Sequence, residues 1–197
     1  MLARMSALQT AFAPPPTATP PSTSTSGSTQ QASSFQSMLQ AASGPAGVAP
    51  AATGRGGTIA QIAARELGQA ESPPGSNNSP RIAEYRSATA GAPGPGPWCA
   101  YFVSWAARQA GMPVGDQGQG FGSVDALYAW AQKAGRAESA SSGYVPRPGD
   151  LIVWDEHIGI VESVGADGSV NMIEDSSDRV SKRTHAAGSA LGYVRMG

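Results

Sequence analysis

The chain is organised around residues 97–111, which read PWCAYFVSWAARQAG and contain the only cysteine of the sequence, Cys99. From Cys99 onward, apolar residues recur every third or fourth position, which is the spacing of one helix face. Gly111 stands where a glycine commonly ends a helix. Cys99 then lies in the first helical turn, where free backbone N–H groups favour negative charge and so the nucleophilic thiolate. The alternative is a small buried hydrophobe on the core face of the helix.

The composition excludes several classes of protein. The 197 residues are enough for one average domain and a tail. Only 14% of residues are charged and the net charge is -1, whereas a nucleic-acid binder needs a basic surface. No apolar run approaches the length of a membrane span. The sequence has no Asp-rich calcium loop, and we expect neither a cofactor nor a bound metal.

Residues 1–57 differ in composition from the rest of the chain. From residue 14 to residue 57 they are almost entirely Pro, Ser, Thr, Ala, Gly and Gln, with Arg55 as the one charged residue. Such a segment buries too little apolar surface to offset the entropy of ordering, so we expect a disordered tail. Residues 2–12 and 34–42 have helical apolar spacing, and either form transient helices or fold on a partner.

The N-terminus resembles a secretory signal peptide only superficially. Ser6, Gln9 and Thr10 interrupt its apolar stretch, which therefore lacks the continuous apolar run of a signal peptide. We expect no conventional cleaved signal.

From Thr58 the patterns predict packed structure in residues 58–197. Thr58 is a candidate N-cap with Gln61 completing a capping box. Helices are predicted over 58–68, 81–86, 99–111 and 123–135, and strands over 151–154, 158–164, 169–174, 179–184 and 191–195. Pro148 and Gly149 suit the central positions of a type II turn before the first strand. Helices followed by an antiparallel meander predict an α+β fold.

A cysteine nucleophile needs a base in contact, and the chain has two histidines. His157 begins a predicted strand, whereas His185 lies in a predicted exposed loop. Counting back from a hairpin loop at 165–168 places Glu174 opposite Gly159, within side-chain reach of His157. A carboxylate there would hold the imidazole tautomer, as in Cys–His–acid triads. Asp175 is the competing acid, because alternating side chains allow only one of the two to face the ring without a bulge.

The order of these parts resembles the CHAP amidase family, which belongs to the papain-like group that includes the NlpC/P60 peptidases. The resemblance covers about residues 58–197. It rests on the helix start Trp98-Cys99-Ala100, the turn Pro148-Gly149-Asp150 and the strand His157-Ile158-Gly159-Ile160-Val161. It implies helices packed on a small antiparallel sheet, with Cys99 as nucleophile, His157 as base and Glu174 as orienting acid.

The resemblance also implies roles for neighbouring residues. Many members carry Asn two residues after the Glu, where this chain has Ser176, so Asp175 and Ser176 are auxiliary candidates. Trp98 and Trp154 are expected to flank the substrate cleft, with packing in the core as the alternative for Trp154.

The implied activity is hydrolysis of an amide bond in bacterial peptidoglycan through a covalent acyl-enzyme, with the stem peptides as partners. The bond is either the sugar–peptide bond of an N-acetylmuramoyl-L-alanine amidase or a peptide bond cut by an endopeptidase. The competing hypotheses are a non-catalytic module that binds wall peptides or a partner, and a transglutaminase-like acyltransferase.

The tail resembles the N-termini of bacterial flagellar export substrates and rod components. This resemblance implies flagellar rod or export partners for residues 1–57, export to the cell envelope or medium without a cleaved signal, and wall remodelling around a flagellum.

Overall fold

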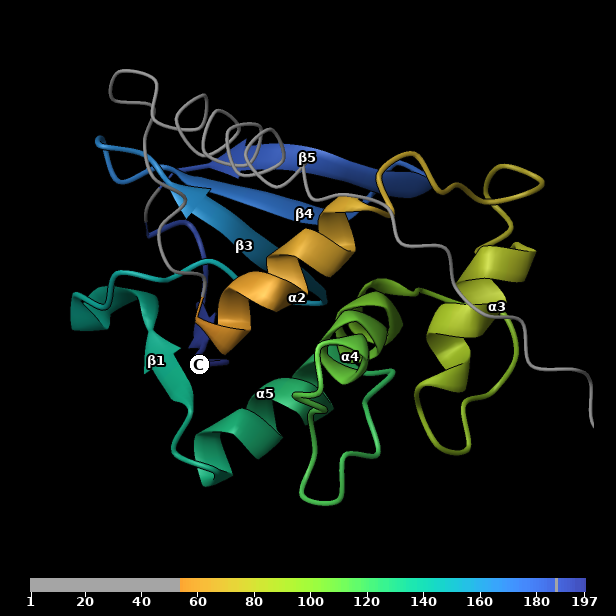
Figure 1. Ribbon diagram of the computed structural model, residues 1–197, viewed down its shortest axis with the longest axis horizontal. Coiled ribbons are helices and arrows are strands. Elements are labelled where there is room, and N and C mark those ends of the chain that lie inside the picture. Colours follow the sequence, from red (N-terminus) through yellow and green to blue (C-terminus); the bar gives the residue numbers. More distant parts are fainter. Residues whose placement is uncertain (1–53, 187) are drawn as a thin grey trace, which may run out of the picture. The chain divides into compact units, whose positions relative to one another are not determined.

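The computed structural model describes residues 54–186 and 188–197, so most of the expected tail lies outside the described residues. The helices are α2 (Arg55–Ala64), α3 (Pro80–Ser87), α4 (Cys99–Gln109), α5 (Val124–Lys133) and the short 3-10 helix η1 (Ala140–Ser142). The strands are β1 (Ala137–Ser139), β2 (Leu151–Trp154), β3 (His157–Val164), β4 (Val170–Ser176), β5 (Arg179–His185) and β6 (Gly192–Val194). This order confirms the predicted α+β class (Figure 1). Among the described helices, none is both long and apolar enough to cross a bilayer.

The strands form one antiparallel sheet in the order β1-β6-β2-β3-β4-β5. Strands β2 to β5 are the predicted meander, and β6 returns to pair with β2 on the other side. Strand β1, which pairs with β6 through Ala137 and Val194, was not predicted from the sequence. Three residues are too few to show an alternating pattern, so only the pairing with β6 defines this edge strand.

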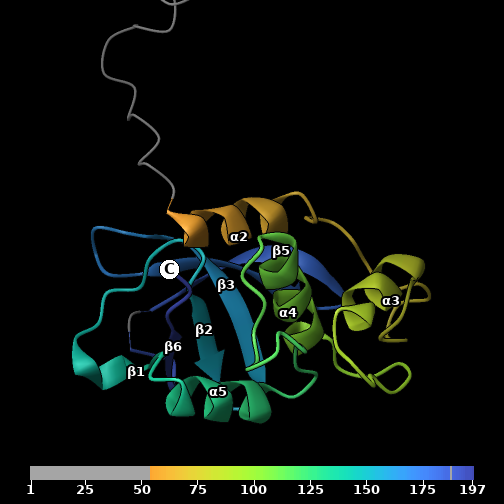
Figure 2. The ribbon, with the colours of Figure 1, turned by 60° about the horizontal axis from the view of Figure 1, so that its bottom comes forward.

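The main core lies between the helices and one face of the sheet. Helix α4 is its centre, because every residue from Cys99 to Ala107 is buried. It lies between α3 and strand β3, as both views show (Figures 1 and 2). A second, smaller core covers the other face of the sheet, and its buried residues are Ile152, Val161, Val170, Met172 and Tyr193. The first residue of α4, Cys99, is therefore part of the main core.

Helix α2 begins at Arg55, three residues earlier than the Thr58 start that the capping pattern predicted. Its N-cap residue makes no side-chain hydrogen bond. The first turn is instead fixed by a tertiary contact, since a Cβ on Gly56 would lie 2.9 Å from the carbonyl oxygen of Pro148. The predicted start at Thr58 is therefore wrong, and the expected division between residues 57 and 58 falls inside α2.

The turn before β2 has the predicted type II form. Asp150 N–H donates to the carbonyl of Arg147 at 3.0 Å, and Gly149 has a φ of +92°. That φ favours glycine. A Cβ on Gly149 would also lie 1.7 Å from the carbonyl oxygen of Gly56, so glycine is required for space as well.

An ion pair between the buried Glu66, just after α2, and the half-buried Arg81 joins this segment to α3. Glu66 is 6% exposed and accepts hydrogen bonds from the Arg81 guanidinium at 2.6 and 2.7 Å and from Tyr85 Oη at 2.7 Å. Burial alone would raise the pKa of Glu66, but these hydrogen bonds outweigh it and lower the pKa. The carboxylate is therefore better stabilised in the folded than in the unfolded chain.

Candidate active site

Cys99 is the first residue of α4, as the sequence predicted. It is 6% exposed, and its Sγ lies 3.9 Å from the carbonyl oxygen of Glu156, in the turn between β2 and β3. The residue before it, Trp98, provides no side-chain cap, so no N-cap side chain occupies the N–H groups at the helix start. The thiol therefore lies at a helix N-terminus and faces the turn between β2 and β3.

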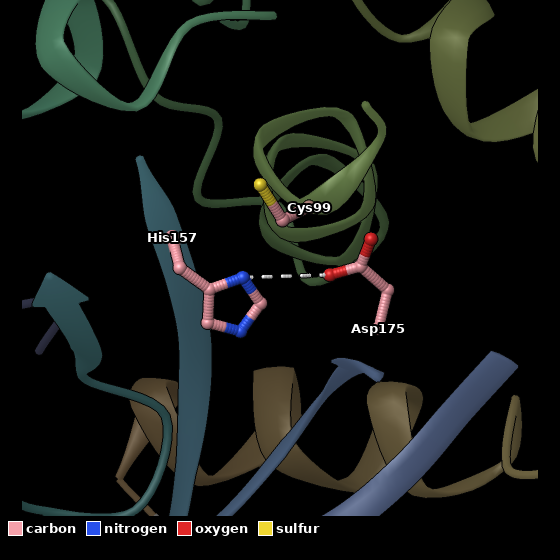
Figure 3. Close-up of side chains that lie close together, drawn as sticks. All are labelled: Cys99, His157 and Asp175. Carbon is pink, nitrogen blue, oxygen red and sulfur yellow. Dashed lines mark ion pairs between the residues drawn. The ribbon is translucent and has the colours of Figure 1, made fainter. Parts of the chain in front are cut away.

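His157 begins β3 and lies beside the thiol. Its Nε2 is 2.8 Å from Oε2 of Glu174, and its Nδ1 is 3.9 Å from Oδ1 of Asp175. Figure 3 shows Cys99 and Asp175 on the Nδ1 side of the ring. One ligand atom from each of Cys99, His157 and Asp175 lies within 4.8 Å of the others. Glu174 therefore forms a hydrogen bond with Nε2 of His157, and Nδ1 faces the thiol of Cys99.

The predicted register at the acid is confirmed, although the hairpin differs from the prediction. A Cβ on Gly159 would lie 3.2 Å from the Cβ of Glu174, so these residues are cross-strand neighbours. At the hairpin, Val164 pairs with Val170, one residue later than expected. A β-bulge in the middle of β3 shifts the pairing back by one residue. The two offsets cancel at Glu174.

Glu174 and Asp175 both reach the imidazole, and they do so from opposite sides. Strand β4 pairs continuously with β5 from Val170 to Ser176, so β4 has no bulge there and its side chains alternate. The expectation that only a bulge would let both acids approach the ring is wrong. His157 stands at the end of its strand, where its ring is reached from both faces of the sheet.

The electrostatics of the cluster favour a protonated imidazole. Hydrogen bonds with Cys99 and Glu174 raise the pKa of His157 to about 10, against the opposing effect of burial. Burial raises the pKa of Asp175 to about 7, and the nearby Glu174 charge adds to this effect. A proton transferred from Cys99 is therefore well held on His157, and an imidazolium beside the thiolate is the arrangement that a cysteine nucleophile requires.

The other predicted site residues have different surroundings. Trp98 is 1% exposed and its Nε1 donates to Glu71 at 3.0 Å, so its expected place in the cleft wall is wrong. Its ring packs in the core because the start of α4 faces α3. Trp154 is half-buried, with its ring 6.1 Å from that of His157. The hydroxyl of Ser176 accepts hydrogen bonds from the guanidinium of Arg183 at 2.7 and 3.0 Å.

His185 is close to the site, contrary to its predicted place in an exposed loop. It ends strand β5 instead of lying in an exposed loop, and its Nε2 is 3.8 Å from Oε2 of Glu174. Its ring lies 4.6 Å from that of Trp154. The signal available in the sequence is the absence of Gly or Pro before Gly188, which allows the strand to continue past Thr184.

A cleft of about 340 Å³ opens beside the thiol. It is lined by Pro97, Cys99, Gly122, Ser123, Val124, Asp125 and Glu156. Its walls are the start of α5 and the turn between β2 and β3. Of these residues, only Cys99 was predicted from the sequence to lie in the site, because the others come from segments far apart in the chain.

The family model of the CHAP domain matches residues 91–176. A solved structure of N-acetylmuramoyl-L-alanine amidase from Staphylococcus aureus is similar at 21% identity and a TM-score of 0.41. That match covers 52% of this chain and 31% of the amidase chain, so it spans about a third of the amidase. No curated protein matches the chain. The cysteine, the histidine beside it and both strand-end acids lie within residues 91–176, the part of the chain that matches the CHAP domain model.

Proposed function

We propose that the chain is a cysteine-dependent peptidoglycan hydrolase that cleaves an amide bond through an acyl-enzyme. One arrangement carries the proposal: Cys99 at the start of α4, with His157 beside it and Glu174 at 2.8 Å on the far nitrogen of the ring. A thiol, a base and an orienting acid are the parts that nucleophilic acyl transfer needs. The CHAP domain match over the same residues supports this reading.

The mechanism follows from the positions of the groups. Nδ1 of His157 takes the thiol proton, and the Cys99 thiolate attacks the carbonyl carbon of the scissile amide. The backbone N–H of Cys99 is the candidate donor to the oxyanion that forms. The imidazolium then protonates the leaving amine, and the C–N bond breaks. Water, deprotonated by His157, hydrolyses the thioester and restores the thiol.

The substrate we propose is the amide linkage of a wall stem peptide. The cleft beside Cys99 has about 340 Å³, which lies within the range of about 300–1,000 Å³ typical of small-ligand sites. It therefore suits a few residues of peptide. Both the sugar–peptide bond and the peptide bonds within the stem are amides that the same chemistry can cut.

Hydrolysis of purified peptidoglycan tests the proposal. We expect the full chain to clear a wall suspension and release soluble products, and Cys99→Ala to abolish release. Product masses identify the bond: an amidase releases intact stem peptides with a free N-terminal alanine, whereas an endopeptidase leaves peptide fragments on the sugars. Asp167→Asn, in the exposed hairpin, is the control and should keep full activity. Wall binding without any release would instead support the non-catalytic module.

We propose in addition that residues 1–57 direct the protein to the cell envelope through flagellar export, for local wall opening around a flagellum. The likeness of this tail to flagellar export substrates supports the proposal. In a flagellated host, a reporter fused to residues 1–57 should leave the cell only while the flagellar export apparatus works. Export of the fusion through the general secretory route, with cleavage near residue 13, would contradict it.

A further inference from the structure

Three side chains of the site carry ligand atoms of the kinds that zinc prefers. Cys99 comes from α4, His157 from β3 and Asp175 from β4, and one ligand atom of each lies within 4.8 Å of the others (Figure 3). Thiolate sulfur, imidazole nitrogen and carboxylate oxygen are the usual protein ligands of Zn²⁺. On a tetrahedral zinc, two such atoms are separated by about 3.3–3.6 Å. Side-chain shifts of about 1 Å would therefore close the site.

The carboxylate of Asp175 has an oxygen without a partner. Its Oδ1 is inaccessible to solvent and accepts no hydrogen bond, although it faces the ring of His157 at 3.9 Å. The side chain as a whole is 16% exposed. A buried acceptor left unsatisfied is costly and rare in native proteins. A cation placed between this oxygen, the thiol and the imidazole would satisfy it.

The histidine is also oriented as metal-binding histidines are. Glu174, which is 4% exposed, accepts the Nε2 proton at 2.8 Å, so Nδ1 is the ring nitrogen that faces Cys99 and Asp175 and can bind a metal once its proton is displaced. Histidines that bind metals generally donate their other ring N–H to a carboxylate or carbonyl, which fixes the tautomer. The contact that prepares His157 as a base therefore also prepares Nδ1 as a ligand.

We propose that Cys99, His157 and Asp175 bind one Zn²⁺ ion, and that zinc in this site blocks hydrolysis. The sulfur and nitrogen ligands select zinc over Mg²⁺ and Ca²⁺, which take oxygen ligands. Binding displaces the thiol proton to solvent and occupies both the nucleophile and the base. The binding site stands on the geometry alone, whereas the block of hydrolysis rests on the proposed function.

Zinc binding is measured on the full chain after treatment with a chelator, by competition with a chromophoric zinc indicator. We expect one zinc per chain, and an affinity lowered at least about tenfold in Cys99→Ser and in Asp175→Asn. Asp167→Asn is the matched control, because this exposed acid lies in the hairpin outside the cluster, and its affinity should be unchanged. Unchanged affinity in both cluster variants, or no binding by the full chain, would overturn the site.

A second measurement needs no variant of the cluster. Zinc should protect Cys99 of the unmodified chain from iodoacetamide, with half-protection at the zinc concentration that half-saturates the site. Magnesium at the same concentration should give no protection. If Cys99 is alkylated equally fast with and without bound zinc, the thiol is not a ligand and the proposal is wrong.

Activity separates this proposal from the proposed function. If the metal-free chain hydrolyses peptidoglycan and loses activity as zinc binds, both proposals hold. If it hydrolyses peptidoglycan but binds no zinc, only the zinc site fails. If zinc binds with the expected variant pattern but no condition gives hydrolysis, the proposed function fails and the binding site remains. Hydrolysis that requires zinc would overturn the proposed inhibition and the cysteine mechanism together.

Discussion

Replacing Glu174 by Gln tests the orientation of His157 most directly. The change keeps the size of a side chain that is 4% exposed, and removes the charge that accepts the Nε2 proton at 2.8 Å. An amide can also turn its NH₂ group toward the ring, because it carries both a donor and an acceptor. Nε2 would then accept, Nδ1 would carry the proton, and the imidazole could no longer deprotonate Cys99.

The expected fall in kcat follows from the loss of the charged hydrogen bond and the loss of the correct imidazole tautomer. A hydrogen bond to a charged group contributes about 1.5–3 kcal/mol, which corresponds to about 10- to 150-fold in rate. A wrong tautomer raises the loss to about 10⁴-fold in catalytic triads. We therefore expect kcat to fall by about 10²- to 10⁴-fold in Glu174→Gln, with KM changed by less than about threefold, because the acid acts on the transition state.

Steady-state hydrolysis of a labelled stem-peptide fragment gives kcat and KM, and the iodoacetamide rate at neutral pH reports on the thiol separately. Ser176→Ala is the matched control, because Ser176 points to the same face of β4 and its hydroxyl binds Arg183 instead of the ring. Asp175→Asn should be milder in kcat than Glu174→Gln. A larger loss in Asp175→Asn would make Asp175 the orienting acid. No loss in either variant would refute the catalytic reading of the cluster.

Three further predictions concern the base, the tail and the fold. His157→Ala should abolish hydrolysis, whereas His185→Ala should lower kcat by less than about tenfold, since His185 reaches the site through Glu174 and Trp154; the reverse order would refute the assignment of the base. A chain that begins at Pro50 should keep its activity within about threefold, but one that begins at Thr58 should unfold at a lower temperature, because it lacks the first turn of α2; equal melting temperatures would contradict this. Glu66→Gln should destabilise the fold by about 1.5–3 kcal/mol at neutral pH. Because the folded-state pKa of Glu66 is lowered, this difference should be full above pH 4.5 and disappear as the pH falls through that folded-state pKa, as measured by urea unfolding; a difference that does not vary with pH would exclude the charge as its cause.

The sequence by itself determined the elements and most of the candidate site. Helical spacing after Cys99, the turn at Pro148-Gly149 and the apolar strands that follow it are local signals, and the structure has a helix, a type II turn and strands there. The pairing of β3 with β4 was also predictable from the short connection between them, but its exact register was not. The count of residues placed Glu174 near His157 because the β-bulge in β3 offsets the one-residue difference at the hairpin.

Only the tertiary structure decided the surroundings of those residues. Local periodicity places a side chain on a face but does not say what covers that face, so Trp98 was assigned to the cleft although it packs against α3. The start of α2 depends on a contact with the turn at Gly149, almost a hundred residues away, which no capping pattern contains. His157 stands at the end of β3, and only the packing of α4 against the sheet brings Cys99 and Asp175 to one ring nitrogen while Glu174 holds the other. Contacts between segments far apart in the chain are selected by the packing of the whole core, and that information is not local to any stretch of sequence.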